Sequence, residues 1–268
     1  MQVTEGTTVL VTGASSGIGA ALAPMLAERG ATVGVVARRE DRLRDVLAQC
    51  KGDGHRYWAC DLGDVVVAER VALEAWDAFG HLDVVVHNAA IPKRRKVQEL
   101  TVPELDNVMA VNFFAPARMT MAVLPRMLER DKGVIVNVSS LGGRLGIAHE
   151  SSYCASKFAL CGWSESMAID LWETGVDVRL IIPGPIATEI WDLPDNDDPL
   201  YHGPFEPPES VAADIVKAIE GDRFETYSPD MKDIAAFKTT EIDLFLQGVA
   251  DMTKQEEARS AEQRRSEA

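Results

Sequence analysis

The strongest constraint on the fold is a regular alternation of short apolar segments with longer amphipathic ones. The short segments are rich in β-branched residues, which favours strands, and the longer segments have helical periodicity. Strands that read as continuous apolar runs are typical of a parallel sheet with helices on both faces. The sequence therefore predicts an α/β protein with a doubly wound parallel sheet. The expected strands cover residues 7–12, 31–37, 55–60, 82–88, 133–139, 176–182 and 224–228, and the expected helices cover residues 17–29, 40–50, 64–79, 103–130, 152–173, 207–221 and 230–253.

Length, charge and cysteine content narrow the class of protein. The chain has 268 residues without an internal repeat or a linker, so we expect a single domain. Its net charge of −15 repels phosphate backbones, which excludes nucleic acid as an expected partner. The four cysteines form no C-x-x-C pair or Cys/His cluster, so we expect reduced thiols in the cytoplasm and no metal site. We find neither a signal peptide nor an apolar run of the roughly 18 residues that a membrane span needs.

A glycine-rich turn follows the first expected strand, in the stretch "VLVTGASSGIGAALAPML". Its glycines, Gly13, Gly17 and Gly19, let the backbone turn sharply and approach a ligand closely. The helix that follows offers unpaired N–H groups and the positive end of its dipole to a pyrophosphate. The spacing G-x-x-x-G-x-G differs from G-x-G-x-x-G, but it predicts the same dinucleotide binding. The alternative is a tight turn that binds nothing.

The end of the second expected strand indicates which dinucleotide is bound. NAD sites usually place Asp or Glu there to hold the ribose hydroxyls, but this strand ends in Ala37 and continues with Arg38 and Arg39. Arg38 could pair bidentately with a 2′-phosphate, which favours NADP. Ser16 supplies no second cation from the glycine loop. The alternative is that both arginines are solvated charges at the start of a helix.

Tyr153 and Lys157 lie four positions apart in the stretch "SSYCASKFAL", where an expected helix would put both on one face. A cation beside a phenol favours the phenolate and lowers the pKa of the phenol. The pair would then act as a general acid and base. Taken alone, the same spacing also occurs in solvated pairs on ordinary surface helices.

Taken together and in order, these motifs resemble the short-chain dehydrogenase/reductase family over about residues 5 to 228. "TGASSGIG" (12–19) is similar to the cofactor loop of the family, and Asp61 stands where the family has an Asp beside the adenine. "HNAA" (87–90) resembles the N-N-A-G turn, except that His87 and Ala90 replace an Asn and a Gly. "PGPIAT" (183–188) resembles the segment that closes over the nicotinamide.

The resemblance implies strand order 3-2-1-4-5-6-7 and a set of catalytic residues. Asn112, Ser140, Tyr153 and Lys157 stand at the family's four catalytic positions. The cofactor site it implies consists of Gly13, Ser15, Ser16, Gly17, Ile18, Gly19, Arg38, Arg39, Asp61, Leu62, Asn88, Ala89, Ala90, Tyr153, Lys157, Pro183, Gly184, Ile186 and Thr188. It also implies a homodimer or homotetramer formed through the long helices at 103–130 and 152–173.

In this scheme Tyr153 donates a proton to a substrate carbonyl during reduction and removes one from an alcohol during oxidation. Ser140 is the second hydrogen-bonding group on the substrate oxygen. Ser139 faces the other way, since successive side chains on a strand alternate. Lys157 also holds the nicotinamide ribose, and Asn112 holds a water or a backbone group that connects Lys157 to solvent.

Three further segments carry weaker expectations. Residues 186–208 could form a lid over an apolar substrate, with Ile190, Trp191 and Tyr201 facing it, or could be ordinary packing. The basic run "PKRRK" (92–96) is expected to be a solvated loop, although Arg94 or Arg95 could meet an acidic substrate. We expect residues 1–254 to form the domain and residues 255–268 to form a polar C-terminal tail.

The sequence thus predicts a cytoplasmic oxidoreductase that transfers hydride between NADP(H) and a ketone or secondary alcohol, of medium size and mostly apolar. One alternative is an NAD-preferring dehydrogenase of the same family. Another is a non-enzymatic dinucleotide-binding scaffold or sensor, which would not need all four catalytic residues. A sugar-nucleotide epimerase is a weaker option, because the chain has no room for a larger C-terminal substrate domain.

Overall fold

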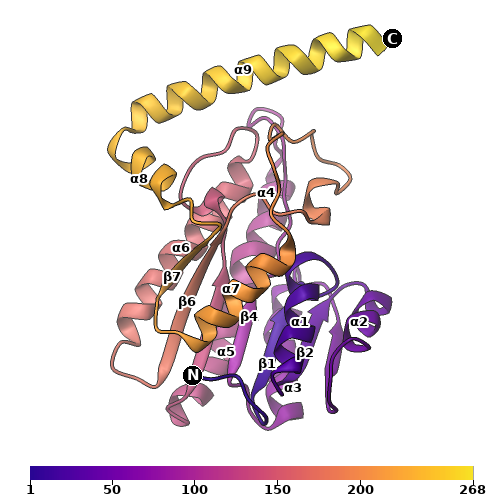
Figure 1. Ribbon diagram of the computed structural model, residues 1–268, viewed down its shortest axis with the longest axis vertical. Helices are drawn as coiled ribbons and strands as arrows, with labels where there is room; N and C mark the ends of the chain where they lie inside the picture. Colours follow the sequence, from indigo (N-terminus) through magenta and orange to yellow (C-terminus); the bar gives the residue numbers. More distant parts are fainter. Residues whose placement is uncertain (268) are drawn as a thin grey trace.

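The computed structural model describes residues 1–267 and contains a seven-stranded parallel sheet of order β3-β2-β1-β4-β5-β6-β7 (Figure 1). The strands are β1 (Thr8–Thr12), β2 (Thr32–Ala37), β3 (Arg56–Ala59), β4 (Val84–His87), β5 (Gly133–Val138), β6 (Val176–Pro183) and β7 (Glu225–Ser228). The helices are α1 (Gly17–Glu28), α2 (Glu40–Leu47), α3 (Val65–Phe79), α4 (Val102–Met109), α5 (Ala115–Glu129), α6 (Ser151–Asp170), α7 (Pro208–Glu220), α8 (Lys232–Thr240) and α9 (Ile242–Glu267). The predicted fold class and strand order are confirmed.

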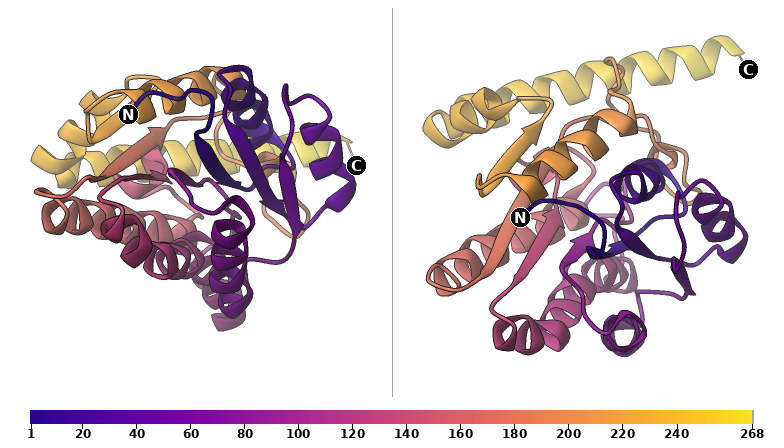
Figure 2. Two further views of the ribbon diagram at one scale, coloured as in Figure 1. Left: turned by 90° about the horizontal axis from the view of Figure 1, so that it is seen from below. Right: turned by 60° about the horizontal axis from the view of Figure 1, so that its bottom comes forward.

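Helices cover both faces of the sheet, as the continuous apolar strands require. Strands β1, β4 and β5 are buried along their whole length. Helices α1, α2 and α7 pack against one face, and α3, α5 and α6 pack against the other. Figure 2 shows these two helical layers with the sheet between them. A parallel sheet exposes neither face to water, so the apolar core is divided between its two sides.

The loops that follow the strands all meet at one edge of the sheet. Because the strands are parallel, their carboxyl ends point the same way, toward the upper part of Figure 1. The strand order reverses between β1 and β4, since β2 follows on one side of β1 and β4 lies on the other. Ligands of open α/β sheets bind in the crevice at such a switch point. The topology therefore places the candidate site beyond β1 and β4.

The long helix expected at 103–130 is interrupted by a π-helical turn, Ala110–Phe114, between α4 and α5. A π turn inserts an extra residue into the helical ladder and is often found at functional positions. Among the described residues, the stretch Val102–Glu129 is long and apolar enough to cross a membrane by length and composition, contrary to expectation. Half of its most apolar 18-residue stretch is buried within the fold. Helix α5 packs against α3, as a core helix of a soluble protein does.

The C-terminal part differs from the sequence-based expectation. The helix predicted at 230–253 is two helices, α8 and α9, which are separated at Glu241. Helix α9 continues through the segment expected to be a polar tail as far as Glu267, and residue 268 lies outside the described residues. It runs across the loop end of the molecule in Figure 1. Its start is anchored by Phe245, which is buried in a small apolar cluster.

Candidate active site

A cavity of about 550 Å³ opens at the carboxyl edge of the sheet. It is lined by every predicted site and lid residue except Gly19 and Asn112. The lining residues follow all seven strands, from the glycine loop after β1 to the start of α8 after β7. The structure therefore brings together predicted site residues that are up to 188 positions apart in the sequence. The sequence predicted that these residues form one site but could not show their proximity.

The glycine loop is closely packed against two neighbouring segments. Gly13 and Gly17 have φ angles of +66° and +54°, which side chains disfavour. A Cβ on Gly13 would lie 2.7 Å from the Cα of Ala89, and one on Gly17 would lie 2.8 Å from Cγ2 of Thr188. Gly19 does not line the cavity, but a Cβ there would lie 2.6 Å from the carbonyl oxygen of Gly13. All three positions thus require glycine, because a Cβ there would collide with a neighbouring segment or with the loop itself.

Hydrogen bonds fasten the glycine loop to the turn after β4. The Thr12 hydroxyl accepts from the backbone N–H groups of Asn88 (3.0 Å) and Ala89 (3.1 Å). The Asn88 amide in turn donates to the carbonyls of Thr12 (3.0 Å) and Gly13 (3.3 Å). Asn88 therefore supports the loop from beneath, in addition to lining the cavity.

His87, which departs from the family pattern, is buried behind this turn. Its Nε2 lies 2.9 Å from the hydroxyl of Thr120 on α5, and its Nδ1 has no partner among the described residues. Burial lowers the pKa of His87 to about 3, so the imidazole is neutral at physiological pH. The substitution is accommodated on the side of the sheet away from the cavity.

Arg39, rather than Arg38, reaches back to the glycine loop. Its guanidinium donates to the hydroxyls of Ser15 (3.0 Å) and Ser16 (2.9 Å). It also pairs with the carboxylate of Glu189 (2.7 Å), which Arg42 contacts as well. These hydrogen bonds and the ion pair hold the pKa of Glu189 below its usual range. Two cations thus converge on the Glu189 carboxylate, and two hydroxyls accept from one of them, whereas Arg38 is exposed at the cavity rim.

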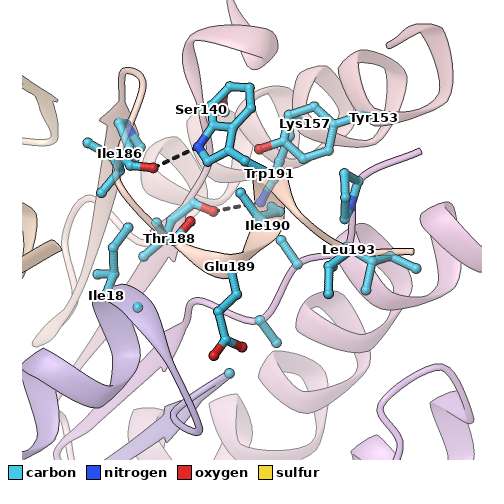
Figure 3. Close-up of a pocket in the computed structure, with 18 of the residues that line it drawn as sticks. Ile18, Ser140, Tyr153, Lys157, Ile186, Thr188, Glu189, Ile190, Trp191 and Leu193 are labelled. Atoms are coloured by element: carbon cyan, nitrogen blue, oxygen red, sulfur yellow. Dashed lines mark hydrogen bonds between the residues drawn. The ribbon is translucent and has the colours of Figure 1, made fainter. Parts of the chain in front are cut away.

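The predicted proton donor stands beside the predicted serine. Tyr153 and Ser140 both line the cavity, and Figure 3 shows Tyr153 and Lys157 projecting into it from the same helix, α6. Burial raises the pKa of Tyr153 well above its usual value, and a hydrogen bond with Ser140 opposes part of that rise. The Ser140 hydroxyl also accepts from the N–H of Gly142 (3.1 Å). Ser139 faces away and donates to the carbonyl of Lys157 (3.2 Å), as strand alternation predicts.

Burial, rather than the neighbouring Lys157, dominates the pKa of Tyr153 in this structure. Its ammonium lies 5.8 Å from the centre of the phenol ring and donates to the carbonyl of Val138 (2.9 Å). Lys157 is 1% exposed, and this burial lowers its own pKa to about 8. The effect of burial on the phenol therefore exceeds the effect of the neighbouring cation.

Asn112 lies in the π-helical turn behind the cavity. Its side-chain oxygen accepts from the N–H of Ile91 (2.8 Å), and its amide donates to the carbonyl of Ile91 and to the hydroxyl of Ser156 (both 3.0 Å). Ser156 lies between Tyr153 and Lys157 on α6. Asn112 thus connects the segment after β4 to helix α6, which carries Tyr153 and Lys157. Of the two groups that Asn112 was expected to hold, a water or a backbone group, the structure shows a backbone group, that of Ile91.

The basic run at 92–96 is not a solvated loop. Arg94 is 4% exposed and donates to the carbonyls of Ile190 (3.2 Å), Trp191 (2.6 Å) and Asp197 (2.9 Å). Lys93 and Arg95 both pair with Asp195, at 2.7 Å and 3.0 Å. The run therefore holds the segment that follows β6, and the expectation of solvated side chains is wrong. It is wrong because carbonyl groups far away in sequence supply its partners.

The segment expected to form a lid lies across one side of the cavity. Ile190, Trp191 and Tyr201 are half-buried and line it. The rings of Trp191, Tyr201 and Phe205 form a cluster with centroids 5.1–6.2 Å apart. The Trp191 indole donates to the carbonyl of Ile186 (2.7 Å), as Figure 3 shows. The aromatic residues thus brace one another and also form a cavity wall.

Helix α9 adds charged contacts at the rim of this wall. Glu257 pairs with Lys96 and with His149 (3.3 Å), and Glu256 pairs with His202 (3.6 Å). These ion pairs join the C-terminal helix to the basic run, to the start of α6 and to the lid segment. The C-terminal sequence, which has no motif, gave no signal of this position.

Several residues of the cavity were not predicted from the sequence. Glu150, Glu189, Met231 and Ile234 line it, although no motif marks them. Glu150 stands three positions before Tyr153, and helical spacing was a usable signal for it. Met231 and Ile234 come from the start of α8, whose position only the folded chain reveals. In the described part of the chain no cluster of side chains has the composition of a metal site.

The chain is similar to known proteins that act on alcohols and carbonyls. The short chain dehydrogenase family profile matches residues 7–198. D-threitol dehydrogenase of Mycolicibacterium smegmatis is 34% identical over 221 residues, which are 79% of this chain and 85% of that protein. The NADPH-dependent pterin aldehyde reductase of Arabidopsis thaliana is 36% identical over 218 residues, 80% of this chain and 90% of that protein.

A solved structure shows the same likeness in three dimensions. A short chain dehydrogenase from Burkholderia cenocepacia, solved in complex with NADP, is 29% identical, with a TM-score of 0.78. The match covers 93% of this chain and 99% of that one. Together with the profile match and the geometry of the cavity, these similarities lead to one conclusion: the chain belongs to the short-chain dehydrogenase/reductase family of NAD(P)-binding oxidoreductases that act on alcohol and carbonyl groups.

Proposed function

We propose that the protein transfers hydride between NADP(H) and a ketone or secondary alcohol of medium size, with Tyr153 as the proton donor and acceptor. One observation carries this proposal. The Tyr153 phenol, the Ser140 hydroxyl and the Lys157 ammonium meet in one cavity that also reaches the glycine loop. A proton donor and a dinucleotide cradle in one cavity are what carbonyl reduction needs.

The residues present fit a dinucleotide. The glycine loop leaves no room for side chains, so its backbone can approach a pyrophosphate at the start of α1. Asp61 and Leu62 line the cavity beyond β3, as expected for an adenine contact. Pro183, Gly184, Ile186 and Thr188 line it after β6, on the opposite side of the glycine loop from β3. The nicotinamide, when bound, supplies or accepts the hydride, and the protein holds and orients it.

The choice of NADP rests on the cluster around Arg39. Its guanidinium and that of the neighbouring Arg42 already hold the carboxylate of Glu189, and the hydroxyls of Ser15 and Ser16 orient the Arg39 guanidinium. A 2′-phosphate presents the same kind of oxygens to the same donors, and Arg binds phosphate well. No acidic residue ends β2 to repel it. An NAD preference is the alternative, in which Arg39 and Arg42 would stay paired with Glu189 alone.

The catalytic residues divide the work among them. Ser140 and Tyr153 hold the substrate oxygen, and Tyr153 gives it a proton or removes one. Lys157 sits where its ammonium can stabilise the phenolate and bind a ribose hydroxyl. Asn112 keeps α6 fixed to the segment after β4 through Ile91 and Ser156. A scaffold or sensor with no catalysis would have no use for a proton donor in this position.

The cavity wall supports a mostly apolar substrate. Part of it is formed by aliphatic and aromatic side chains from the segment between β5 and α6, from the lid and from the start of α8: Leu141, Leu145, Ile147, Ile190, Trp191, Leu193, Leu200, Met231 and Ile234. Such a wall binds hydrocarbon through the loss of water-exposed apolar surface. We take residues 186–208 as the substrate lid within the domain.

Assembly and location follow the family as proposals. Large apolar side chains are exposed on α5 and on the α6 region, among them Met121, Phe158, Ile169 and Trp172. We propose that these helices form the interface of a homodimer or homotetramer. Light scattering after gel filtration should give at least twice the monomer mass of 29.2 kDa, and a monomer would contradict the proposal. All four cysteines are free, which supports a reducing, cytoplasmic location.

The Tyr153→Phe variant tests the catalytic assignment. It removes only the phenolic oxygen, so kcat/KM for ketone reduction should fall about 100- to 10,000-fold, the usual contribution of a positioned acid. The measurement is the loss of NADPH absorbance with a panel of ketones. NADPH affinity, followed by fluorescence, should change little. As a control, Tyr57→Phe removes a hydroxyl that bonds Glu40 outside the cavity and should keep the wild-type rate. A wild-type rate in Tyr153→Phe would overturn the assignment.

The Arg39→Ala variant tests the choice of cofactor. It removes a charged donor set, so the Kd for NADPH should rise about 10- to 100-fold, while the Kd for NADH should change less than about threefold. Fluorescence titration with each cofactor measures both constants. Arg70→Ala, on the exposed side of α3, is the matched control for loss of one positive charge. An equal loss for both cofactors would rule out recognition of the 2′-phosphate at this cluster.

The Arg94→Met variant tests the lid. It leaves the carbonyls of Ile190, Trp191 and Asp197 without their common donor, so the segment should open more often. We expect limited proteolysis within residues 186–208 to become about tenfold faster and the KM for ketones to rise by a similar factor. Arg118→Met on the surface of α5 should change neither quantity. An unchanged cleavage rate in Arg94→Met would show that Arg94 does not hold the lid.

A further inference from the structure

Glu150 is a buried carboxyl group that the catalytic scheme does not use. It is 8% exposed and lines the cavity, one helical turn before Tyr153. Although it stands at the N-cap position of α6, its side chain does not cap the helix. Within the described part of the chain, the carboxylate has no hydrogen-bond or ion-pair partner. Buried carboxylates are rare without a partner, because removal from water costs several kcal/mol.

The surroundings of Glu150 explain why no protein group satisfies it. Arg94 is the nearest cation that acts on it, but the Arg94 guanidinium donates to the carbonyls of Ile190, Trp191 and Asp197. The negative charge of Glu150 also contributes to the raised pKa values of Tyr153 and Cys154. Burial raises the pKa of Glu150 to about 7, and the attraction of Arg94 opposes only part of that rise. The acceptor oxygens of Glu150 therefore remain available to a molecule in the cavity.

The position of Glu150 fixes what kind of group it can meet. Residues at i and i+3 of a helix lie on one face, about 5–6 Å apart at Cβ. Glu150 and Tyr153 can therefore contact neighbouring parts of one bound molecule. A carboxylate accepts hydrogen bonds and needs a donor. The nearby positive charge of Arg94 disfavours a cationic donor such as an ammonium group. Of the neutral donors, we take a hydroxyl rather than an amide N–H, because the proposed reaction acts on alcohols and carbonyls.

We propose that Glu150 is a substrate-binding residue that accepts a hydrogen bond from a hydroxyl group lying one or two carbons from the reacting carbon. The preferred substrates are then α- or β-hydroxyketones, or the corresponding diols, with an apolar remainder. This inference rests on the proposed function, because it assumes that Tyr153 acts on the carbonyl. It goes beyond that function by naming a second polar group on the substrate and the residue that selects it.

Matched ketones test the inference. The parent ketones are 2-octanone and 4-phenyl-2-butanone, and each is compared with its 1-hydroxy and 4-hydroxy derivatives as a substrate for NADPH-dependent reduction. We expect at least one hydroxyketone of each set to exceed its parent in kcat/KM by about 10- to 100-fold, the range for a hydrogen bond to a charged group. Equal values for parent and derivatives in both sets would overturn the inference.

Variants of Glu150 locate the preference. In Glu150→Leu the ratio of hydroxyketone to parent kcat/KM should fall to about one. Glu150→Gln, which keeps an acceptor oxygen in the same shape, should keep part of the preference and guards against misfolding of the leucine variant. Glu173→Leu, an exposed position after α6, should keep the wild-type ratio. A wild-type ratio in Glu150→Leu would overturn the assignment to this residue.

The same measurements separate failure of this inference from failure of the proposed function. Reduction of the parent ketones without a preference for the hydroxyketones contradicts the role of Glu150 alone. No NADPH oxidation with any of the ketones contradicts the proposed reaction and, with it, the inference. NADPH affinity of each Glu150 variant, measured by fluorescence, should equal that of the wild type, because Glu150 acts on the substrate. A large loss of NADPH affinity would also overturn the inference.

Discussion

The hydrogen bonds between Thr12, Asn88 and Gly13 are the constraint on which the site depends. They join the carboxyl ends of β1 and β4, the two strands at which the order of the sheet reverses. Parallel strands leave their last backbone groups unpaired at this edge, and buried backbone groups need partners. Thr12 and Asn88 supply those partners, and the glycine loop can then turn without a side chain of its own. The crevice for a dinucleotide is a consequence of this arrangement.

Much of the fold and part of the site were predictable from the sequence, for physical reasons. Buried strands must be mostly apolar, so the five inner strands and their parallel arrangement are visible as apolar runs, whereas the edge strands β3 and β7 are only partly buried. Gly13, Ser140, Tyr153 and Lys157 were predictable because each carries a chemical role that few residue types can fill. Their positions in one cavity agree with that prediction. The assignment of their roles stays a prediction.

The rest of the site depends on contacts between segments that are distant in sequence. The basic run at 92–96 looks solvated when it is read alone, but Arg94 finds its acceptors about 100 residues later. The pKa of Tyr153 follows burial, which a helical spacing to Lys157 does not reveal. Arg39, the N-cap residue of α2, reaches the glycine loop, and the sequence alone does not separate it from Arg38. Such features require the folded chain.

The contacts of helix α9 have a consequence for the entrance of the cavity. Glu256 and Glu257 reach the rim through His202 and Lys96, whose side chains are 62% and 38% exposed, whereas the buried Arg94 holds the inner part of the lid through hydrogen bonds. Exposed ion pairs weaken as dissolved ions screen them, and buried hydrogen bonds are much less affected. We therefore expect dissolved salt to loosen the contacts at the outer rim more than the hydrogen bonds of the inner wall, so that the entrance responds to ionic strength before the residues beneath it do.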